Sequence, residues 1–398
     1  MSGLAPEPLR IPAHVPADRV IDFDLSQDAA LRFDPFKRLG EVRDRSPRVA
    51  YTSGNGGHWI AFAREDIQRI LGDGETFSSA HLGGGGDGVG FIPLSIDPPA
   101  HGPWRLVLLK HLGPAQVRAM EPFIRGWAER LIKPLVGQDS CDFLKAVAEP
   151  MPVSVFMVTM GLPLERFDEF RGLVMAALTP PDEGADASER MGVMGRIMGV
   201  LNDLIEARRV EPKDDLISRL LAEEVDGRAI THAEMMSIGF LLFLAGLDTV
   251  TNAMTYGMRH LAAHPDLQED LRQDRGKIPA VMEKMLQLYT FVNTNRLVTR
   301  DTEVDGVTIK AGELIWIPLW AGSNAPGETE GARHMAFGGG HHLCLGAQLA
   351  RLELKAMYET WFDHIGPFSL APDPLPAMRG GSVMNITRLL LRMERVRP

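Results

Sequence analysis

One cysteine at the start of a strong helix pattern is the most chemically suggestive feature of the chain. Cys344 follows a loop that contains Gly338, Gly339 and Gly340, and it precedes the periodic apolar segment AQLARLELKAMYETWF. The free N–H groups and the dipole at a helix N-terminus stabilise a thiolate and lower the pKa of the thiol. Glycines allow a flat ligand to approach the backbone closely, and Gly346 leaves room beside the sulfur. The pattern therefore predicts a thiolate that serves as a ligand to a flat cofactor.

Three other interpretations of Cys344 compete with this ligand role. A zinc site needs further cysteines or histidines at metal-binding spacing, and the chain has only two cysteines. A nucleophile activated by a histidine base would explain a reactive thiol, but it gives no reason for Phe337 or for the glycines. A plain buried cysteine does not need this loop. That structural role fits Cys141 instead, because a free cysteine usually behaves as a small buried hydrophobe.

A second chemical signal is an acid–alcohol pair in the middle of an apolar helix pattern. Residues 241–255 read LLFLAGLDTVTNAMT, with Asp248 and Thr249 among apolar neighbours. A buried carboxylate costs free energy unless it is paired or functional. We expect the Thr249 hydroxyl to bond back to the carbonyl of Ala245, one turn earlier, and such a bond tends to bend a helix. Such a bend opens a groove in the helix, and Gly246 widens it. The pattern therefore predicts a groove able to hold O₂ and an ordered water beside a metal.

The elements that position these residues are predicted to be mostly helical. Apolar residues recur at helical spacing in residues 115–135, 151–175, 188–209, 214–223 and 232–262. A short helix is expected over residues 64–71, and a last helix is expected to follow Cys344 and to run through about Trp361.

Short β elements are predicted at both ends of this helical region. Residues 47–63 contain two β-rich runs around a Gly/Asn turn, which indicates a hairpin. Residues 296–318 alternate around the dipeptide Asp305-Gly306, another hairpin signal. The tail after the last helix contains strand-like pieces, and the prolines of residues 1–20 predict an extended arm. The expected fold class is mainly α with small β-sheets.

Composition excludes several functions. The net charge of −10 argues against nucleic acid as a partner, because phosphate binding needs a basic surface. Two cysteines are too few for a secreted disulfide framework, and the Pro-rich start has no apolar core typical of a signal peptide or anchor. The most apolar run, Ile238–Leu247, is too short to cross a membrane. We expect a soluble, cytoplasmic protein that does not bind membranes.

The segment HLGGGGDGVG, residues 81–90, is rich in glycine. A phosphate-binding P-loop would continue with Gly-Lys-Ser/Thr, whereas Phe91 follows here. Because each glycine adds conformational freedom, the segment predicts a mobile surface loop rather than a phosphate site.

The cysteine loop resembles the signature of the cytochrome P450 family, Phe-Gly-x-Gly-x-His/Arg-x-Cys-x-Gly. The fixed positions of that signature are all met, by Phe337, Gly338, Gly340, His342, Cys344 and Gly346. Residues 245–249, AGLDT, are similar to the family pattern Ala/Gly-Gly-x-Asp/Glu-Thr. The resemblance implies one domain over residues 1–398, a triangular prism with haem b buried between two long helices. It implies Cys344 as the axial ligand of the haem iron.

The same resemblance implies roles for other residues. Thr249 is expected to stabilise bound dioxygen, and Asp248 is expected to belong to the proton relay. The segment DPPAHGPWR is similar to the family pattern Asp-Pro-Pro-x-His-x-x-x-Arg, which implies a haem propionate contact. Gly102 and Pro103 interrupt that segment, and we expect them to delay the helix start. The residues implied to hold the haem are His101, Arg105, Ala245, Arg296, Phe337, Gly338, His342, Cys344 and Gly346.

One motif of the family is missing. A helix before the β region usually carries Glu-x-x-Arg, but here the two positions are Lys284 and Gln287, and the register that starts at Glu283 does not restore the motif. The segment between Trp320 and Phe337 is also shorter than the family meander, which carries the arginine that pairs with that glutamate. Loss of a whole buried ionic network can be nearly neutral, whereas loss of one partner is costly. We therefore expect a rebuilt core. The sequence leaves open whether Lys284 or Arg333 supplies a substitute contact.

Within the family the chain is most similar to the bacterial camphor hydroxylase group. A tyrosine that binds the substrate ketone in that group is Val89 here, so an apolar, cyclic, terpenoid or norisoprenoid-like substrate is expected. The implied pocket residues are Val89, Leu94, Leu241, Leu244, Ala245 and Val292, and the loop 81–90 is the expected gate.

No flavin or nicotinamide domain is recognisable in the sequence, so electrons are expected from a [2Fe–2S] ferredoxin and an NADH-dependent reductase. Arg105 and Lys110 are expected near the docking face of a monomeric enzyme. Two other functions compete. A haem-binding protein or sensor without turnover would agree with the missing Glu-x-x-Arg, but Asp248 and Thr249 argue against it. The other is a peroxide-driven or isomerising haem-thiolate enzyme. Such enzymes tend to lose the acid–alcohol pair, which this chain keeps.

Overall fold

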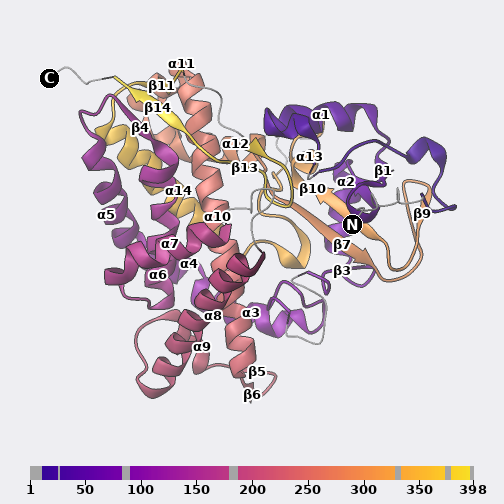
Figure 1. Cartoon of the computed structure of the whole chain (residues 1–398), viewed down its shortest axis with the longest axis horizontal. Coiled ribbons are helices and arrows are strands. Elements are labelled where there is room, and N and C mark those ends of the chain that lie inside the picture. The colour runs from indigo at the N-terminus through magenta and orange to yellow at the C-terminus, as the bar shows by residue number, and fades with distance from the viewer. Residues whose placement is uncertain are drawn as a thin grey trace, which may run out of the picture. The chain divides into compact units, whose positions relative to one another are not determined.

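The computed structural model describes residues 11–25, 27–82, 90–178, 187–327, 333–372 and 378–394, with only the backbone for 177–178 and 187–190. The chain divides into two compact units. Unit 1 contains residues 1–81, 283–344 and 374–387, and unit 2 contains residues 82–282, 345–373 and 388–398. The helix-rich structure with small sheets confirms the predicted fold class (Figure 1). The single domain over 1–398 stays a prediction.

Unit 1 is built around a mixed five-stranded sheet with the order β1-β2-β10-β7-β3. Its α-helices are α1 (Pro35–Arg45), α2 (Arg64–Gly72), α13 (Leu319–Ser323) and the end of α12 (Ile278–Leu288). Its strands are β1 (Val49–Thr52), β2 (His58–Ala61), β3 (Phe77–Ser78), β7 (Asn293–Val298), β8 (Thr302–Val304), β9 (Val307–Ile309), β10 (Leu314–Pro318), β12 (Met378–Arg379) and β13 (Asn385–Ile386).

Both predicted hairpins of unit 1 are present. Strands β1 and β2 pair antiparallel, with Val49 opposite Ala61. Strands β8 and β9 pair antiparallel around Asp305 and Gly306, whose φ angles are 51° and 73°. This left-handed backbone at both central residues is what a two-residue hairpin turn requires. Strand β10 pairs with β7 in a register that places Ile315 opposite Arg296.

Unit 2 is mainly helical. Its helices are α3 (His101–Leu112), α4 (Pro114–Ala119), α5 (Glu121–Ile132), α6 (Pro150–Met160), α7 (Phe167–Leu178), α8 (Ala187–Val210), α9 (Leu216–Leu221), α10 (His232–Ala263), α11 (Pro265–Gln273), the start of α12, and α14 (Ala347–His364). Its strands are β4 (Ser140–Asp142), β5 (Glu224–Val225), β6 (Arg228–Ala229), β11 (Phe368–Leu370) and β14 (Leu390–Met393), and β11-β14-β4 form one sheet.

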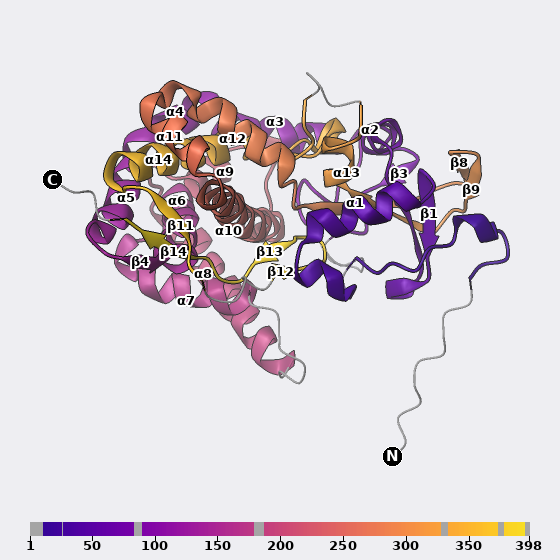
Figure 2. The same ribbon diagram turned by 90° about the horizontal axis from the view of Figure 1, so that it is seen from above.

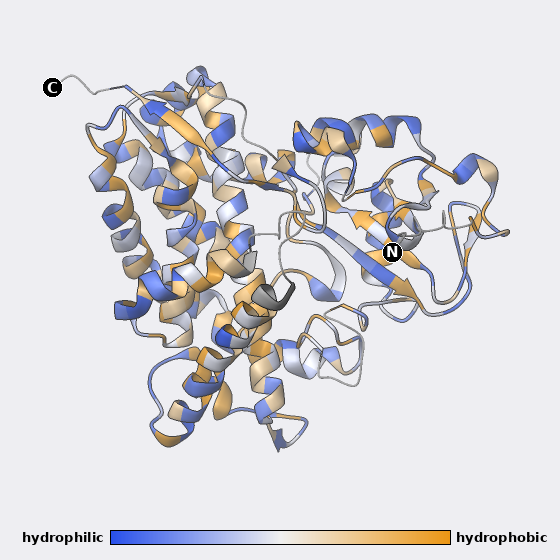
Figure 3. Cartoon of the chain, in the orientation of Figure 1, coloured by the Kyte–Doolittle hydropathy of each residue, from blue (hydrophilic) through white to orange (hydrophobic). Residues whose placement is uncertain are grey.

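Helix α10 is the central element of unit 2. It contacts α6, α8 and α14, and Figure 2 views it nearly end on among these helices. A capping box starts it, in which the Thr231 side chain accepts from the Glu234 N–H and the Glu234 side chain accepts from the Thr231 N–H. Phe243 of α10 makes an edge contact with Phe156 at 6.0 Å between ring centroids. Apolar residues predominate along the helix (Figure 3).

By length and composition, α10 is the one helix of the described ranges that would suffice to cross a membrane. The central helix of a water-soluble core passes the same test. Polar Asn252 and Thr255 are buried inside unit 2, as expected for a core helix.

Three local predictions were wrong. Residues 115–135 form two helices, because α4 ends at Ala119 and α5 begins at Glu121 with Pro122, which has no N–H to donate to the preceding turn, as its second residue. Residues 151–175 also form two, because Gly161 ends α6 with a φ of 89°, a left-handed conformation that favours glycine. Helix α3 is not delayed but begins at His101. Pro103 is tolerated there because backbone N–H groups in the first turn of a helix have no acceptor within the helix, so a proline at this position removes no helical hydrogen bond.

The described part of the N-terminal arm is not simply extended. Residues 1–10 lie outside the described residues, and Ala17–Arg19 form a short 3-10 helix. Val20 then forms a bridge with Tyr51 of β1.

Candidate functional site

The cysteine loop of unit 1, residues 337–344, is fixed by its backbone. The Cys344 N–H donates to the Phe337 carbonyl at 2.9 Å, which closes the loop. Gly338 and Gly340 adopt φ angles of 72° and 62°, a conformation that L side chains rarely adopt. A Cβ at Gly340 would lie 1.9 Å from the carbonyl oxygen of Leu71. The loop thus requires glycine at position 340 on two grounds.

This loop leaves the Cys344 side chain exposed. Two residues further on, Gly346 is the N-cap of α14, and the helix runs from Ala347 to His364, close to the predicted end. Cys141 differs in every respect. It is buried in β4, and burial raises the pKa of its thiol to about 12, which keeps it protonated and inert.

The cysteine loop and the neighbouring sheet of unit 1 supply further predicted residues. Phe337 and His342 are half-buried. Arg296 of β7 is 2% exposed, and its Nη1 donates to the Asn295 carbonyl at 2.7 Å and the Thr294 hydroxyl at 3.1 Å. A guanidinium can bind a carboxylate through two parallel hydrogen bonds, so a buried arginine at this position fits an anionic group such as a carboxylate of a cofactor.

In unit 2 the acid–alcohol pair has the predicted local geometry. The Thr249 hydroxyl donates to the Ala245 carbonyl at 2.7 Å, which confirms the expected bond to the preceding turn. Ala245 and Gly246 are exposed although they lie in the middle of a central helix. A Cβ added at Gly246 would meet nothing within 4 Å. This exposed stretch of α10 leaves space for a ligand.

Asp248 has a partner that the sequence interpretation missed. The Asn252 side-chain amide donates to the Asp248 carboxylate at 3.0 Å and to the Asp248 carbonyl at 2.8 Å. Burial raises the pKa of Asp248 to about 6, and the hydrogen bond from Asn252 opposes that rise. The four-residue spacing places both on one helix face, and that spacing was the available signal.

Helix α3 presents the other predicted haem contacts of unit 2. His101 is buried and Arg105 is half-buried. Their spacing of four residues on a continuous helix places them on one face. The start of α3 at His101 therefore brings the two side chains together, despite Gly102 and Pro103.

The predicted substrate contacts are placed in part. Leu241, Leu244 and Leu94 are half-buried in unit 2, and Leu244 also packs against the hydrophobic core. Val292 of unit 1 is half-buried and forms a bridge with Val383. Val89 and most of the glycine-rich gate, residues 83–89, lie outside the described residues.

The position of the missing Glu-x-x-Arg motif is occupied by neutral hydrogen bonds, here named the Gln287–Ser323 network (Gln287, Thr290, Ser323, Asn324). The Gln287 side chain donates to the Ser323 carbonyl at 3.1 Å, and Asn324 donates to the Gln287 carbonyl at 2.8 Å. The Thr290 hydroxyl donates to the Ser323 hydroxyl at 3.0 Å, and the latter also accepts from the Met335 N–H at 2.8 Å. The expectation of a rebuilt core is met by this network.

Lys284 and Arg333 take minor parts beside the network. The Lys284 ammonium donates to the Gln287 side-chain oxygen at 3.2 Å. Arg333 contributes its carbonyl, which accepts from Arg64 at 2.7 Å. Glu283 pairs with His334, with 2.9 Å between carboxylate oxygen and Nε2. Lys284 thus contacts the network from the surface, and Arg333 accepts a hydrogen bond through its backbone carbonyl.

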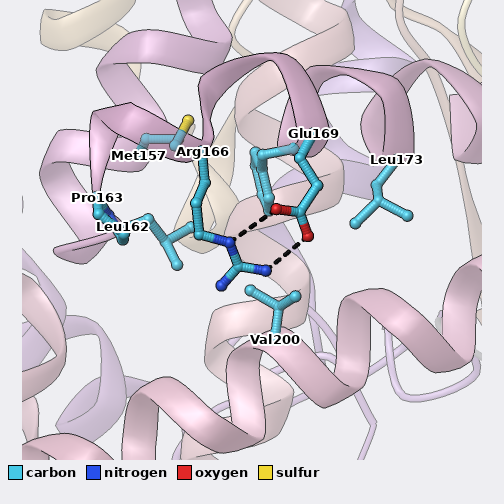
Figure 4. A pocket seen from close by; sticks show the side chains of 8 residues that line it. Met157, Leu162, Pro163, Arg166, Glu169, Leu173 and Val200 are labelled. Carbon is cyan, nitrogen blue, oxygen red and sulfur yellow. Dashed lines mark hydrogen bonds and ion pairs between the residues drawn. The ribbon is translucent and has the colours of Figure 1, made fainter.

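A separate pocket opens in unit 2 at the ends of α6 and α7 (Figure 4). Its lining is mostly apolar. The Arg166–Glu169 ion pair, at 2.6 Å between Nη2 and Oε1, lies at this pocket. The pocket includes none of the predicted site residues, so we assign it no part in the site. Its lining residues are Met157, Leu162, Pro163, Arg166, Glu169, Phe170, Leu173 and Val200.

Taken unit by unit, the residues fit a flat, anionic cofactor with a thiolate ligand. Unit 1 supplies an exposed thiol on a glycine-shaped loop and a buried arginine. Unit 2 supplies an exposed stretch in the middle of α10 with an acid and an alcohol beside it.

Comparisons with known proteins agree on one family. The family model "Cytochrome P450" matches residues 173–328. A probable cytochrome P450 127A1 from Sinorhizobium fredii is 32% identical over 403 residues, which covers 96% of this chain and 96% of the relative. The erythromycin C-12 hydroxylase of Saccharopolyspora erythraea is 32% identical over 84% of this chain and 88% of its own length.

Solved structures give the same result. The crystal structure of cytochrome P450 CYP101C1 matches with a TM-score of 0.88 and 34% identity, over 97% of this chain and 100% of that one. The crystal structure of CYP101J2 matches with a TM-score of 0.86 and 32% identity, over 97% and 99% of the two chains.

Proposed function

The chain belongs to the cytochrome P450 family, and from that premise we propose that it hydroxylates small, apolar, cyclic substrates of terpenoid or norisoprenoid size. As a member, it is a haem-thiolate monooxygenase with haem b as its cofactor. The proposal adds the substrate class, a [2Fe–2S] ferredoxin with an NADH-dependent reductase as the electron source, and a soluble, cytoplasmic, monomeric state. The single observation that carries the substrate class is the apolar, exposed stretch of α10 at Ala245 and Gly246.

We assign Cys344 as the thiolate ligand. When bound, the haem supplies the activation of O₂, and a cysteine thiolate ligand favours cleavage of the O–O bond. The exposed thiol, the closed loop and the glycine at position 340 together hold the sulfur at a surface that a flat ring can approach. Arg296, Arg105 and His101 are the proposed partners of the propionates.

Asp248 and Thr249 are the proposed proton-handling residues. A group with a pKa near the working pH both takes and gives protons efficiently, and burial brings the pKa of Asp248 to about 6. Asn252 holds that carboxylate on the face of α10 that also contains Ala245 and Thr249. The Thr249 hydroxyl, bonded to the Ala245 carbonyl, keeps its oxygen next to the exposed stretch. The two side chains can therefore pass a proton towards a ligand at this stretch.

The substrate class is supported by the side chains on the same helix face. Leu241 precedes Ala245 by four residues and is half-buried, so the two lie on one side of α10. An apolar wall binds apolar rings but discriminates weakly between them. We therefore expect several related ring compounds to bind.

The test compares two alanines on the same helix. Ala245→Phe fills the exposed stretch, whereas Ala263→Phe places the same ring about 27 Å further along α10, given a rise of about 1.5 Å per residue. With the haem-loaded protein we expect apolar cyclic ketones and alcohols of terpenoid size to shift the Soret band of the wild type. Ala245→Phe should weaken their binding at least tenfold, and Ala263→Phe should change it less than twofold.

Hydroxylated products should then form from the same compounds with NADH, reductase and ferredoxin. The substrate proposal fails if no compound of this class binds the wild type, or if Ala245→Phe binds them as tightly as the wild type does.

A further inference from the structure

Residues 334–336 of unit 1 lead into the cysteine loop and form neither helix nor strand. Side chains and turn bonds must therefore hold this segment in place. The Met335 N–H donates to the Ser323 hydroxyl at 2.8 Å, and the Met335 carbonyl accepts from the Gly338 N–H at 2.8 Å. Both bonds act at Met335, so the residues on either side of it need other contacts.

The His334 side chain supplies such contacts in three directions. Its Nδ1 accepts from the Ala336 N–H at 3.2 Å, and its Nε2 lies 2.9 Å from a carboxylate oxygen of Glu283 in α12. Its ring contacts the ring of Phe337, with 6.0 Å between the centroids and 43° between the planes. Only 9% of the side chain is exposed. One nearly buried ring thus links α12 to the backbone at Ala336 and to the first residue of the cysteine loop.

The two hydrogen bonds of His334 define where its proton lies. A ring nitrogen that accepts a hydrogen bond carries no proton, so the contact with the Ala336 N–H places the proton on Nε2. That proton is donated to Glu283. An imidazole can accept with one nitrogen and donate with the other, whereas a guanidinium has five donors and no acceptor. An arginine at position 334 could therefore pair with Glu283 but could not accept from the Ala336 N–H.

The contact with the backbone outweighs the contact with Glu283. The Glu283 side chain is 37% exposed, and pairs near the surface contribute little to stability because water competes for both partners. The Ala336 N–H, in contrast, would lose its acceptor inside a partly buried segment, which is the costlier change. His334 thus acts through its acceptor nitrogen and its ring face, and not as a substitute for the charge of the missing family arginine.

We propose that His334 is a positioning residue for the haem site, which sets the orientation of Phe337 through the Ala336 N–H and through ring contact. This inference rests on the proposed function, because it takes the cysteine loop to hold the haem. The Phe337 carbonyl accepts from the Cys344 N–H at 2.9 Å. A displaced Phe337 therefore weakens the bond that closes the loop, and the loop should release haem more readily.

The first measurement is hydrogen exchange at the Ala336 amide of the haem-loaded protein, by mass spectrometry with fragmentation to single residues. Two substitutions separate the two halves of the ring. His334→Asn keeps an acceptor oxygen at the place of Nδ1 but is too short to reach Glu283. His334→Arg can reach Glu283 but offers no acceptor. We expect exchange at the Ala336 amide to be at least tenfold faster in His334→Arg and to change less than threefold in His334→Asn.

The second measurement is the rate at which each protein releases haem to an excess of apomyoglobin. We expect at least fivefold faster release from His334→Arg and less than a twofold change in His334→Asn. The matched control is His364→Asn in unit 2, where His364 contacts Glu129 with 2.8 Å between Nε2 and a carboxylate oxygen. It should leave both rates within twofold of the wild type. A purely structural role for His334 would lower the melting temperature of both His334 variants without this difference in haem release.

The inference is overturned if either rate of His334→Arg equals that of the wild type. It is also overturned if His334→Asn has the larger effects, because the pair with Glu283 would then be the important contact. The carbon monoxide spectrum of the wild type separates this inference from the proposed function. If that spectrum is not of the thiolate type, the proposed function fails and the inference fails with it. If it is of the thiolate type and His334→Arg keeps its haem as the wild type does, the inference alone fails.

Discussion

The cysteine loop and the Gln287–Ser323 network lie in the same unit, but different kinds of interaction hold them in place. The loop depends on backbone conformation: Gly340 has a φ of 62°, and the Leu71 carbonyl occupies the place of a side chain. The network depends on side-chain hydrogen bonds among neutral groups, such as Thr290 and Ser323. A backbone requirement has one solution, glycine, whereas a set of donors and acceptors can be satisfied by several residue types. This difference explains why the loop keeps the family signature while the ion-pair motif is replaced.

The strongest test of the backbone requirement is Gly340→Ala. The left-handed conformation costs a non-glycine residue about 1–2 kcal/mol, and the added Cβ also collides with the Leu71 carbonyl. We expect the loop to shift, the thiolate-type carbon monoxide spectrum to be lost in most molecules, and the melting temperature to fall. The control is Gly312→Ala, at a φ of 88° with nothing within 4 Å, which should lower the melting temperature only slightly and keep the spectrum. If Gly340→Ala and Gly312→Ala change the melting temperature and the spectrum equally, the cysteine loop has no special backbone requirement at position 340.

The next effect concerns the centre of the network. Ser323→Ala removes the acceptor of the buried Met335 N–H and of the Thr290 hydroxyl. A buried donor left without a partner costs about 1–3 kcal/mol. We expect a clear fall in the melting temperature of the haem-loaded protein with an unchanged carbon monoxide spectrum. Ser369→Ala, at an exposed serine of β11, is the control and should have no measurable effect. A loss of the thiolate-type spectrum in Ser323→Ala would contradict the independence of the two regions.

The smallest effect is expected when the family motif is put back. The double variant Lys284→Glu, Gln287→Arg recreates Glu-x-x-Arg but breaks the bond from Gln287 to the Ser323 carbonyl. An ion pair near the surface contributes only about 0–1 kcal/mol, so it offsets that loss in part. We expect the double variant to be slightly less stable than the wild type in thermal melts, and Gln287→Arg alone to be less stable still. An increase in stability of the double variant would show that the neutral network is an incomplete replacement.

Sequence patterns predicted the parts of the site that depend on local structure. The start and end of α14, the β8–β9 turn at Asp305 and the bond from Thr249 to Ala245 all follow from residue types a few positions apart. The start of α3 was wrong for a local reason as well, since a proline in the first turn is tolerated.

Contacts between segments distant in the sequence could not be predicted. The Leu71 carbonyl that excludes a side chain at Gly340 belongs to α2, far from the cysteine loop in the chain. The partners of Gln287 are supplied by α13 and its flank, and polar residues in that segment have no fixed spacing from α12. Such networks form from tertiary packing, so residue types alone leave several arrangements open. Asn252 is an intermediate case, because its four-residue spacing from Asp248 was visible but unspecific.

The central claim is that Cys344 is the haem ligand, and the two cysteines of the chain provide their own control. The measurement is the absorption spectrum of the reduced, carbon monoxide-bound protein for the wild type, Cys344→Ala and Cys141→Ala. We predict a far red-shifted Soret band in the wild type and in Cys141→Ala, because the Cys141 thiol is buried and protonated, and its loss in Cys344→Ala. A red-shifted band that persists without Cys344, or that never forms in the wild type, would contradict the account.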